Sequence, residues 1–290
     1  MTKFHPLVLE AFKHAGIDPA TLQITSGHPA GPDGVGYFTK TLPTDQVVAE
    51  HESLTAMNRT APAGFCPRSF GIAKDEKSGQ AGMVSEYFEL GGRKDQRALG
   101  KALAEMHRES PGINRFGFHV DTFCGATRQD NTWTEGWKEF FVQRRAGDLV
   151  RRLGDRSVTT LWEKMQEKAI PLLLDDITPS PRPVIVHGDL WSGNVATNSK
   201  TDQPVVFDPS SCYAHNEYDL GICAMFGGFT KDFYDAYHSV HPRSERYYDE
   251  RLKLYELYHH LNHALMFGGG YKSGAFSIMR NLIEFAEGHS

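Results

Sequence analysis

The residues best suited to chemistry stand together in one segment, Val184–Asn194. Three apolar residues, which predict a short buried strand, lead directly into His187 and Asp189, and Asn194 follows five residues after that Asp. A carboxylate such as Asp189 can accept the proton of a hydroxyl group, and an Asn side chain can offer its oxygen to a divalent cation. A tight loop containing two glycines allows both groups to point into one cleft. This spacing indicates phosphoryl transfer to a hydroxyl group.

A second carboxylate follows a predicted β-hairpin. Val195–Thr197 and Pro204–Phe207 read as two short strands, and the second of them ends at Asp208. Folded as a hairpin, the segment returns Asp208 to the side of Asn194, where their oxygens suit Mg²⁺. The competing interpretation is that these side chains only cap strand ends, but the offsets agree with the catalytic loop and metal-binding Asp of kinases. We therefore predict Asp189 as the catalytic base, with Asn194 and Asp208 as the metal ligands.

A third element lies near the N-terminus. Lys40 belongs to a predicted strand at Tyr37–Thr41, and Glu50 lies on a predicted helix at Thr44–Arg59. A Lys in this position can hold the α- and β-phosphates of ATP, and a helix Glu can fix its ammonium group. Two ordinary surface charges are the competing interpretation. Glu52 is a second candidate on the same helix, facing another direction.

The elements around these motifs divide the chain into two parts. The first third mixes predicted strands and helices, and amphipathic patterns of helical period dominate the rest, at 99–106 and 254–265. We predict an α+β, protein-kinase-like, two-lobed fold. Residues 1–90 form a small mixed α/β N-lobe that binds nucleotide, and residues 91–290 form a larger, mainly helical C-lobe.

Composition limits the classes of partner. The 290 residues are 40% hydrophobic and 23% charged, which is typical of folded globular proteins. A net charge of −5 gives no reason to expect nucleic acid or an anionic membrane as a partner. No apolar run approaches the ~20 residues of a membrane span. The four cysteines contain no CxxC pair and are predicted to be reduced, mostly buried thiols: Cys66, Cys124, Cys212 and Cys223. We predict a cytoplasmic protein.

Two further groups of polar residues admit alternative interpretations. His259 and His263 are one helical turn apart, a spacing that can bind metal, and His260 lies between them. No carboxylate sits at ligand spacing, so we favour histidines that line a helix face. Glu217 and Asp219 could form a catalytic acid pair. We favour structural roles, in which Asp219 accepts hydrogen bonds from backbone N–H groups of the catalytic loop.

The motifs together resemble one family. The string His187–Asn194, with Trp191 followed by Ser-Gly, is similar to the fructosamine/ketosamine 3-kinase family, within the aminoglycoside/choline kinase-like superfamily. The resemblance covers roughly residues 37 to 271, and its combined motifs are far more specific than any one of them. Further matching segments are Phe207–Pro209, Glu217–Leu220, Phe226–Phe229, Phe233–Tyr237, Tyr258–His263 and Phe267–Tyr271.

The resemblance implies an activity and further site residues. The activity is ATP- and Mg²⁺-dependent phosphorylation of the 3-hydroxyl of ketosamines, which are sugar adducts of free amines or of protein lysines. Loss of phosphate from the product would release the amine, a deglycation repair. The implied adenine hinge, acting through its backbone, is Glu86, Tyr87 and Phe88. The implied substrate residues are His187, Trp191, His263 and Tyr271, and the apolar face of Trp191 suits a sugar ring.

One segment departs from the family pattern. Kinases of this kind have a Gly-rich phosphate loop between two strands ahead of the Lys, but Gly27 and Lys40 leave little room for it here. Prolines in this interval remove backbone donors. We therefore predict a shortened phosphate cover. The alternatives are another small-molecule kinase acting on an aminoglycoside or choline-like acceptor, a nucleotide-binding pseudokinase or, more distantly, a metallohydrolase.

Overall fold

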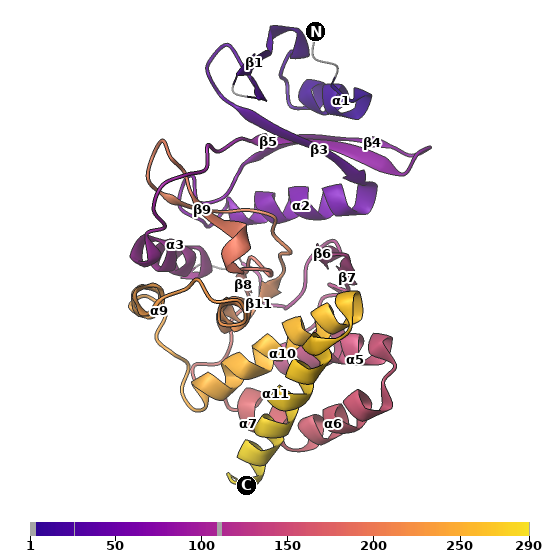
Figure 1. Ribbon diagram of the computed structural model, residues 1–290, viewed down its shortest axis with the longest axis vertical. Helices are drawn as coiled ribbons and strands as arrows, with labels where there is room; N and C mark the ends of the chain where they lie inside the picture. The colour runs from indigo at the N-terminus through magenta and orange to yellow at the C-terminus, as the bar shows by residue number, and fades with distance from the viewer. Residues whose placement is uncertain (1–3, 26, 109–111, 290) are drawn as a thin grey trace.

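The computed structural model describes residues 4–25, 27–108 and 112–289, and it has two lobes (Figure 1). The lobe that carries the N-terminus is built around a small antiparallel sheet with a helix on each face. The other lobe is mainly helical and carries the C-terminus. This architecture confirms the predicted α+β, two-lobed fold. The division at residue 90 stays a prediction.

The sheet of the first lobe positions Lys40. The lobe contains α1 (Pro6–His14), β3 (Tyr37–Pro43), α2 (Thr44–Met57), β4 (Ser69–Asp75) and β5 (Gln80–Glu86). The strand order is β3–β5–β4, with both neighbours antiparallel to β5. Helix α1 packs on one face of this sheet and α2 on the other (Figure 1). Gly82 permits the close approach of α1, because a Cβ there would stand 2.7 Å from the carbonyl oxygen of Leu7.

The strand β5 ends at Glu86, so Tyr87 and Phe88 of the implied hinge follow it rather than belong to it. Strand β4 was not predicted, because its sequence has no regular alternation of apolar and polar residues.

A miniature hairpin stands where the phosphate cover was expected. Strands β1 (Gln23–Thr25) and β2 (His28–Ala30) have three residues each and pair antiparallel. Their turn includes Gly27, whose φ of 87° favours glycine. A shortened strand-turn-strand therefore does precede Lys40, but it begins at Gln23, ahead of the interval from Gly27 to Lys40. The imidazole of His28 stacks on the Tyr87 ring at a centroid distance of 3.7 Å, so the hairpin lies beside the end of β5.

The second lobe combines helices with short hairpins. Its helices are α3 (Gln96–Arg108), α4 (Trp137–Phe140), α5 (Gly147–Leu153), α6 (Arg156–Glu167), α7 (Ala169–Leu174), α8 (Leu220–Cys223), α9 (Lys231–His238), α10 (Tyr248–Phe267) and α11 (Gly270–Glu287). One π-helical turn, Phe141–Ala146, joins α4 to α5. The strands are β6 (Thr122–Cys124), β7 (Thr127–Gln129), β8 (Val184–Ile185), β9 (Val195–Thr197), β10 (Pro204–Val206) and β11 (Tyr213–Ala214).

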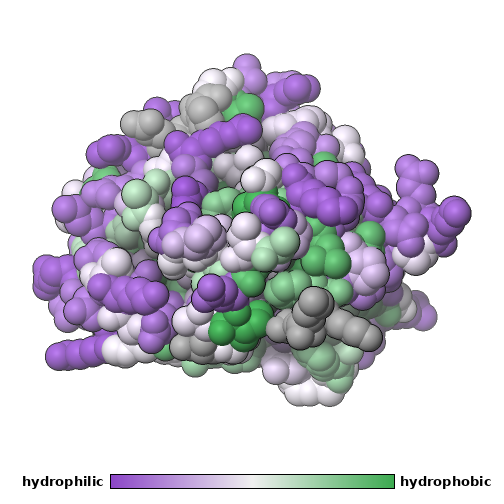
Figure 2. All heavy atoms as spheres, turned by 90° about the horizontal axis from the view of Figure 1, so that it is seen from above, coloured by the Kyte–Doolittle hydropathy of each residue, from purple (hydrophilic) through white to green (hydrophobic). Residues whose placement is uncertain are grey.

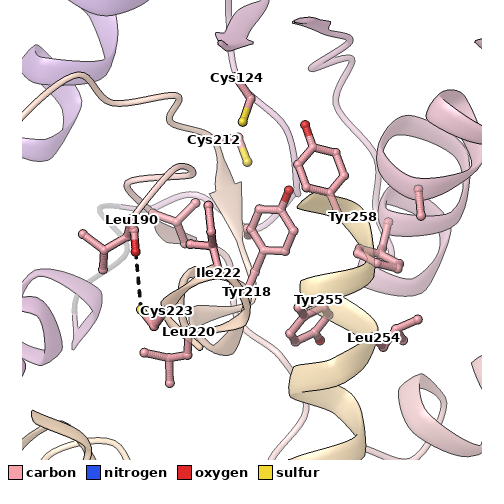
Figure 3. Close-up of a cluster of buried hydrophobic side chains, with 14 of the residues drawn as sticks. Cys124, Leu190, Cys212, Tyr218, Leu220, Ile222, Cys223, Leu254, Tyr255 and Tyr258 are labelled. Carbon is pink, nitrogen blue, oxygen red and sulfur yellow. Dashed lines mark hydrogen bonds between the residues drawn. The ribbon is translucent and has the colours of Figure 1, made fainter. Parts of the chain in front are cut away.

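Helix α10 runs through the core of this lobe. Its Leu254, Tyr255 and Tyr258 are fully buried. Figure 3 shows Tyr258 reaching from α10 toward Cys124, with Cys212 nearby. The four cysteines are all free and buried, as predicted. Core thiols and aromatic rings thus pack directly beneath the catalytic loop.

The outer surface of the first lobe is mixed. Seen from the end that carries α1, the molecule is mostly hydrophilic, with smaller apolar groups between the polar ones (Figure 2). The apolar residues of α1, among them Val8 and Phe12, are turned inward against the sheet. No helix in the described part of the chain is both long and apolar enough to cross a bilayer.

Candidate active site

The catalytic loop takes its shape from close backbone packing. Strand β8 pairs with β11. This pairing brings residues 208–212, which come just before β11 in the chain, back against the loop. Gly188 has a φ of 84°, and a Cβ there would stand 2.0 Å from the carbonyl oxygen of Ser210. Any other residue would collide with that backbone. The chain can therefore turn from β8 to Asp189 only because position 188 is glycine.

The buried carboxylate of Asp219 holds the backbone of this loop in place. Its Oδ2 accepts a hydrogen bond of 2.6 Å from the His187 N–H, and its Oδ1 accepts one of 2.7 Å from the Gly188 N–H. His107 also contacts Oδ2, at 3.1 Å. Burial alone would raise the pKa of Asp219, but these contacts outweigh it and hold the pKa below its ordinary value. The predicted structural role of Asp219 is confirmed.

The hairpin β9–β10 brings the two predicted metal ligands together. Val195 pairs with Val206, and the Phe207 N–H donates to the carbonyl oxygen of Asn194 at 3.2 Å. The next residue, Asp208, therefore lies beside Asn194 at the open end of the hairpin. Asn194 Nδ2 donates to the Asp189 carbonyl oxygen at 2.9 Å, which leaves its Oδ1 available as an oxygen ligand. The predicted hairpin is confirmed.

Lys40 connects the two lobes at this point. Its ammonium forms an ion pair with Glu50 on α2 and stands 3.4 Å from Asp208 Oδ1. Burial raises the pKa of Glu50, and the nearby Asp208 adds to this, while Lys40 opposes it. Glu52, the alternative partner, contacts His119 instead at 2.8 Å. The structure therefore pairs Lys40 with Glu50.

Two adjoining cavities meet at Asp189. The first, of about 380 Å³, is polar and lies between the lobes; its lining includes Lys40, Glu50, Asn194 and Asp208. The second, of about 530 Å³, is mostly apolar and lies in the second lobe. Both are lined by Gly125, Asp189 and Trp191. The site thus has a charged side and an aromatic side, with one carboxylate at the junction.

The carboxyl group of Asp189 is tuned by its surroundings. Burial raises its pKa to about 6, and the negative charges of Asp219 and Asp208 act in the same direction. Hydrogen bonds with Cys124 and Asn194 partly oppose this rise. A carboxylate with a raised pKa is a better proton acceptor than a fully solvated one.

Aromatic rings surround the second cavity. Trp191 is 38% exposed and lies over Gly193, where a Cβ would stand 2.1 Å from the ring. The Trp191 ring meets Phe226 edge-on at a centroid distance of 5.7 Å. His263 and Tyr271 both line the cavity, and their ring centroids are 4.9 Å apart. The structure therefore groups Trp191, His263 and Tyr271 at one cavity, and their contact with the acceptor stays a prediction.

The prediction that His187 touches substrate is wrong. Its side chain has no accessible surface, and it lines neither of these cavities. Its Nε2 contacts the Phe207 carbonyl oxygen at 2.9 Å. Burial lowers its pKa, so the ring is neutral. His187 instead ties the catalytic loop to the chain just before Asp208.

The predicted hinge lies at the end of β5, outside the lining of both cavities. The Glu86 carboxylate accepts hydrogen bonds from Arg68, and the Tyr87 N–H donates to the Gly36 carbonyl oxygen at 3.0 Å. Any contact with adenine would therefore have to use other backbone groups here, such as those of Phe88. The role of Glu86, Tyr87 and Phe88 stays a prediction.

Sequence reasoning missed the hairpin β6–β7. Its first strand lies against α2, and the end of β6 together with the turn that follows brings Phe123, Cys124 and Gly125 to the lining of the two cavities. Gly125 has a φ of 61°, and a Cβ there would stand 2.9 Å from Met266 Sδ. Residues of these types on a short hairpin form no motif, so the sequence offered no signal for them.

Comparisons with known proteins show the family to which the chain belongs. The sequence model of the fructosamine kinase family matches residues 33–285. A ketosamine-3-kinase of Mus musculus is 43% identical over 193 residues, which are 65% of this chain and 60% of that protein. A chloroplastic protein-ribulosamine 3-kinase of Oryza sativa subsp. japonica is 39% identical over 213 residues, 71% of this chain and 60% of that protein. The chain thus spans about three fifths of the length of these curated relatives.

A solved structure extends the comparison to the fold. A crystal structure from Thermobifida fusca, assigned as a fructosamine-3-kinase, superimposes with a TM-score of 0.79 at 26% identity. The superposition covers 97% of this chain and all of that one (100%). The kinase-like fold predicted from the sequence is therefore confirmed.

Proposed function

Because the chain belongs to the fructosamine kinase family, we propose that it transfers the γ-phosphate of ATP to the 3-hydroxyl of ketosamines. Fructosamine and ribulosamine adducts of amines or protein lysines are the proposed acceptors, and the proposed role is deglycation repair. The supporting observation is the meeting of a charged and an aromatic cavity at Asp189. A phosphate donor on one side and a sugar on the other would face the same carboxylate.

Each residue at the junction has a proposed task. Asp189 accepts the proton of the attacking hydroxyl, for which its raised pKa suits it. Lys40, held by Glu50, binds the phosphates of the donor. Trp191 offers a flat apolar surface against which a sugar ring can be oriented. Asp219 acts only through the loop backbone and is a positioning residue.

The residues present also fit a bound magnesium ion. Mg²⁺ prefers oxygen ligands and usually takes one or two from protein carboxylates, with the rest from water and phosphates. Asn194 Oδ1 and the Asp208 carboxylate are such oxygens, and both residues line the charged cavity. When bound, the ion would neutralise charge on the phosphates. We propose Asn194 and Asp208 as its protein ligands.

Replacing Asp208 with Asn should raise the magnesium concentration needed for half-maximal turnover by at least about tenfold. Asp208 has a φ of 55°, which Asn tolerates, so the change removes charge without adding strain. Asp202→Asn is a matched control, because this exposed Asp has a φ of 54° at the far end of the same hairpin. Magnesium titrations of both variants measure the effect. An unchanged requirement in Asp208→Asn would contradict the ligand role.

Replacing Trp191 with Ala should raise the acceptor KM by about tenfold, or roughly 1.4 kcal/mol, through loss of the aromatic surface. Trp191→Phe keeps a ring over Gly193 and should recover most of the affinity. Initial rates at varied acceptor concentration and saturating ATP give the acceptor KM of each variant. An acceptor KM equal to that of the unchanged protein in Trp191→Ala would exclude the sugar contact.

Substrate trials test the function itself. Ribulosyl-lysine, fructosyl-lysine, choline and an aminoglycoside are offered separately with ATP and Mg²⁺, and the phosphorylated product is located by nuclear magnetic resonance. Phosphate on the 3-hydroxyl of a ketosamine supports the proposal. Transfer only to choline or the aminoglycoside would favour the general small-molecule kinase. Nucleotide binding without transfer to any acceptor would favour the pseudokinase, to which the miniature hairpin β1–β2 also points.

Two further proposals concern the lobe boundary and the location of the protein in the cell. We propose residue 90 as the boundary between a nucleotide-binding lobe and the catalytic lobe. We also propose a cytoplasmic location, which the four free thiols support because reducing compartments keep cysteines unpaired.

A further inference from the structure

Three side chains from separate parts of the chain converge beside the catalytic carboxylate. Cys124 ends β6, Asp189 lies in the catalytic loop, and His259 comes from α10. One ligand atom from each of them, a thiol sulfur, a carboxylate oxygen and a ring nitrogen, lies within 4.8 Å of the other two. Cys124 and His259 are almost completely buried, and neither has a task in the proposed phosphoryl transfer.

The group is held in place by its neighbours. Asn262 Nδ2 donates to the Cys124 carbonyl oxygen at 3.2 Å, which ties β6 to α10. The Tyr258 side chain reaches toward Cys124 (Figure 3), and its hydroxyl accepts a hydrogen bond from Gln129 at 2.6 Å. The His259 ring packs edge-on against Tyr258 at a centroid distance of 4.9 Å. Packing thus keeps Cys124 and His259 close to each other.

Unpaired polar atoms lie at the same place. His259 Nδ1 and Asn262 Oδ1 are both buried, and among the described residues neither has a hydrogen-bond partner. Leaving such an atom unpaired is unfavourable, because it has lost its hydrogen bonds to water without gaining others. Two unsatisfied atoms one helical turn apart, next to a thiol and a carboxylate, are what a site for an absent cation would leave.

The ligand set indicates the class of cation. Thiolate and imidazole ligands select borderline-soft ions such as Zn²⁺, whereas Mg²⁺ prefers oxygen. A tetrahedral zinc site with bonds of about 2.0–2.3 Å needs ligand atoms roughly 3.3–3.8 Å apart. Because the three atoms already lie within 4.8 Å of one another, shifts of no more than about 1.5 Å would bring them to these separations. A thiolate and a carboxylate would balance the two charges of the ion.

We propose that Cys124, Asp189 and His259 form a binding site for a borderline-soft divalent cation of the Zn²⁺ type, and that its occupancy blocks Asp189. The apolar cavity of about 530 Å³ opens onto Cys124 and Asp189, so it provides the entry path and room for a water as fourth ligand. A carboxylate bound to the cation cannot accept a proton from the acceptor. This consequence rests on the proposed function, whereas the binding itself does not.

Binding is tested on the full chain without nucleotide or acceptor. After treatment with a chelator, the protein is titrated with Co²⁺, whose thiolate complexes show a charge-transfer absorption in the near ultraviolet, and then with Zn²⁺. We expect one equivalent of Co²⁺ to produce this absorption and one equivalent of Zn²⁺ to remove it. Millimolar Mg²⁺ should not compete.

Matched variants separate this site from other thiols. Cys124→Ser should abolish the absorption and weaken Zn²⁺ binding by at least about 100-fold, and His259→Gln should weaken it by at least about tenfold. Cys66→Ser changes a thiol that is equally buried but lies outside the proposed site. This variant should keep both the Co²⁺ absorption and the Zn²⁺ affinity. Thermal unfolding shows that each variant is folded. Binding unchanged in both Cys124→Ser and His259→Gln would overturn the site.

Kinetics test the consequence. At a fixed free Zn²⁺ concentration, the rate of phosphate transfer should be lower than without Zn²⁺. Raising the acceptor concentration should restore the rate, whereas raising the ATP concentration should not. If Zn²⁺ inhibits Cys124→Ser as strongly as the unchanged protein, the proposal that the cation blocks Asp189 is overturned. A protein that binds Zn²⁺ but phosphorylates no ketosamine would instead contradict the proposed function and leave the cation site standing.

Discussion

Replacing Asp189 with Asn is expected to lower kcat by about 10²- to 10⁴-fold and to leave nucleotide affinity almost unchanged. The amide has the shape of the carboxylate but cannot take the proton of the attacking hydroxyl. The backbone carbonyl of residue 189, which accepts from Asn194, is retained, so the metal side of the loop keeps its contacts. Single-turnover rates measure the chemical step, and a fluorescent nucleotide analogue measures binding.

A matched change elsewhere excludes a general effect of charge. Asp232 lies on the surface helix α9 and contacts only Arg97, at 3.1 Å, among the described residues. Asp232→Asn should therefore leave kcat within about twofold. Turnover in Asp189→Asn equal to that of Asp232→Asn would refute the role of Asp189 as the base.

Replacing Arg251 with Met is expected to lower the free energy of unfolding by about 3–5 kcal/mol. Arg251 and Glu217 form an ion pair of 2.6 Å in which both side chains are only 1% exposed. Arg251 also donates to the carbonyl oxygens of Ser244 and Arg246. Met fills much of the volume but leaves the Glu217 carboxylate buried without its partner, which is the costly part. Urea unfolding followed by circular dichroism measures the difference.

Two further variants isolate the pair. The double variant Glu217→Gln/Arg251→Met should recover part of the loss, because it removes the stranded charge. Arg243→Met breaks an exposed contact of 3.8 Å with Asp249 and should cost no more than about 1 kcal/mol. A loss in Arg251→Met as small as that in Arg243→Met would show that burial does not govern this pair.

The same pair gives a signed pH dependence. Burial would raise the pKa of Glu217, but His215, Arg251 and the Ser244 N–H outweigh it and hold the pKa below its ordinary value of 4.5. A lowered folded-state pKa contributes stability above the unfolded value and loses it as the pH falls through the folded one. In Arg251→Met the carboxyl lacks its cation, so its charged form is disfavoured. The difference in unfolding free energy should therefore be full near pH 7. It should shrink as the pH falls, first through the raised pKa of Glu217 in the variant and then through its lowered pKa in the unchanged protein; a constant difference would exclude this linkage.

Local sequence was sufficient for the metal-ligand hairpin. Apolar runs of strand length at β9 and β10, separated by turn residues, determine that Asp208 returns beside Asn194. The catalytic loop was equally readable, because its Asp-to-Asn offset is a property of one short segment. Glycine at 188 supplies the required turn, and no distant residue is needed to predict it.

Contacts between residues far apart in the sequence could be predicted only where a pattern common to kinases indicated them. Lys40 and Glu50 could be paired in advance, but two acidic residues on α2 were candidates, and only packing showed that Glu52 contacts His119. The assignment of His187 failed for a related reason. A polar residue next to the base suggests contact with substrate, whereas His187 is buried and its ring contacts the Phe207 carbonyl oxygen, 20 residues further along the chain.

The proposed reaction class could be inferred from the amino-acid sequence, because the groups proposed to perform it lie within two short segments whose spacing is fixed by covalent geometry. The surroundings of the proposed base, in contrast, emerge only from the folded chain. Cys124 and His259 are 65 and 70 positions from Asp189 along the chain, and no pattern of periodicity relates them. Packing of β6 against α10 places them beside it, since a folded core brings together whatever side chains its facing surfaces carry.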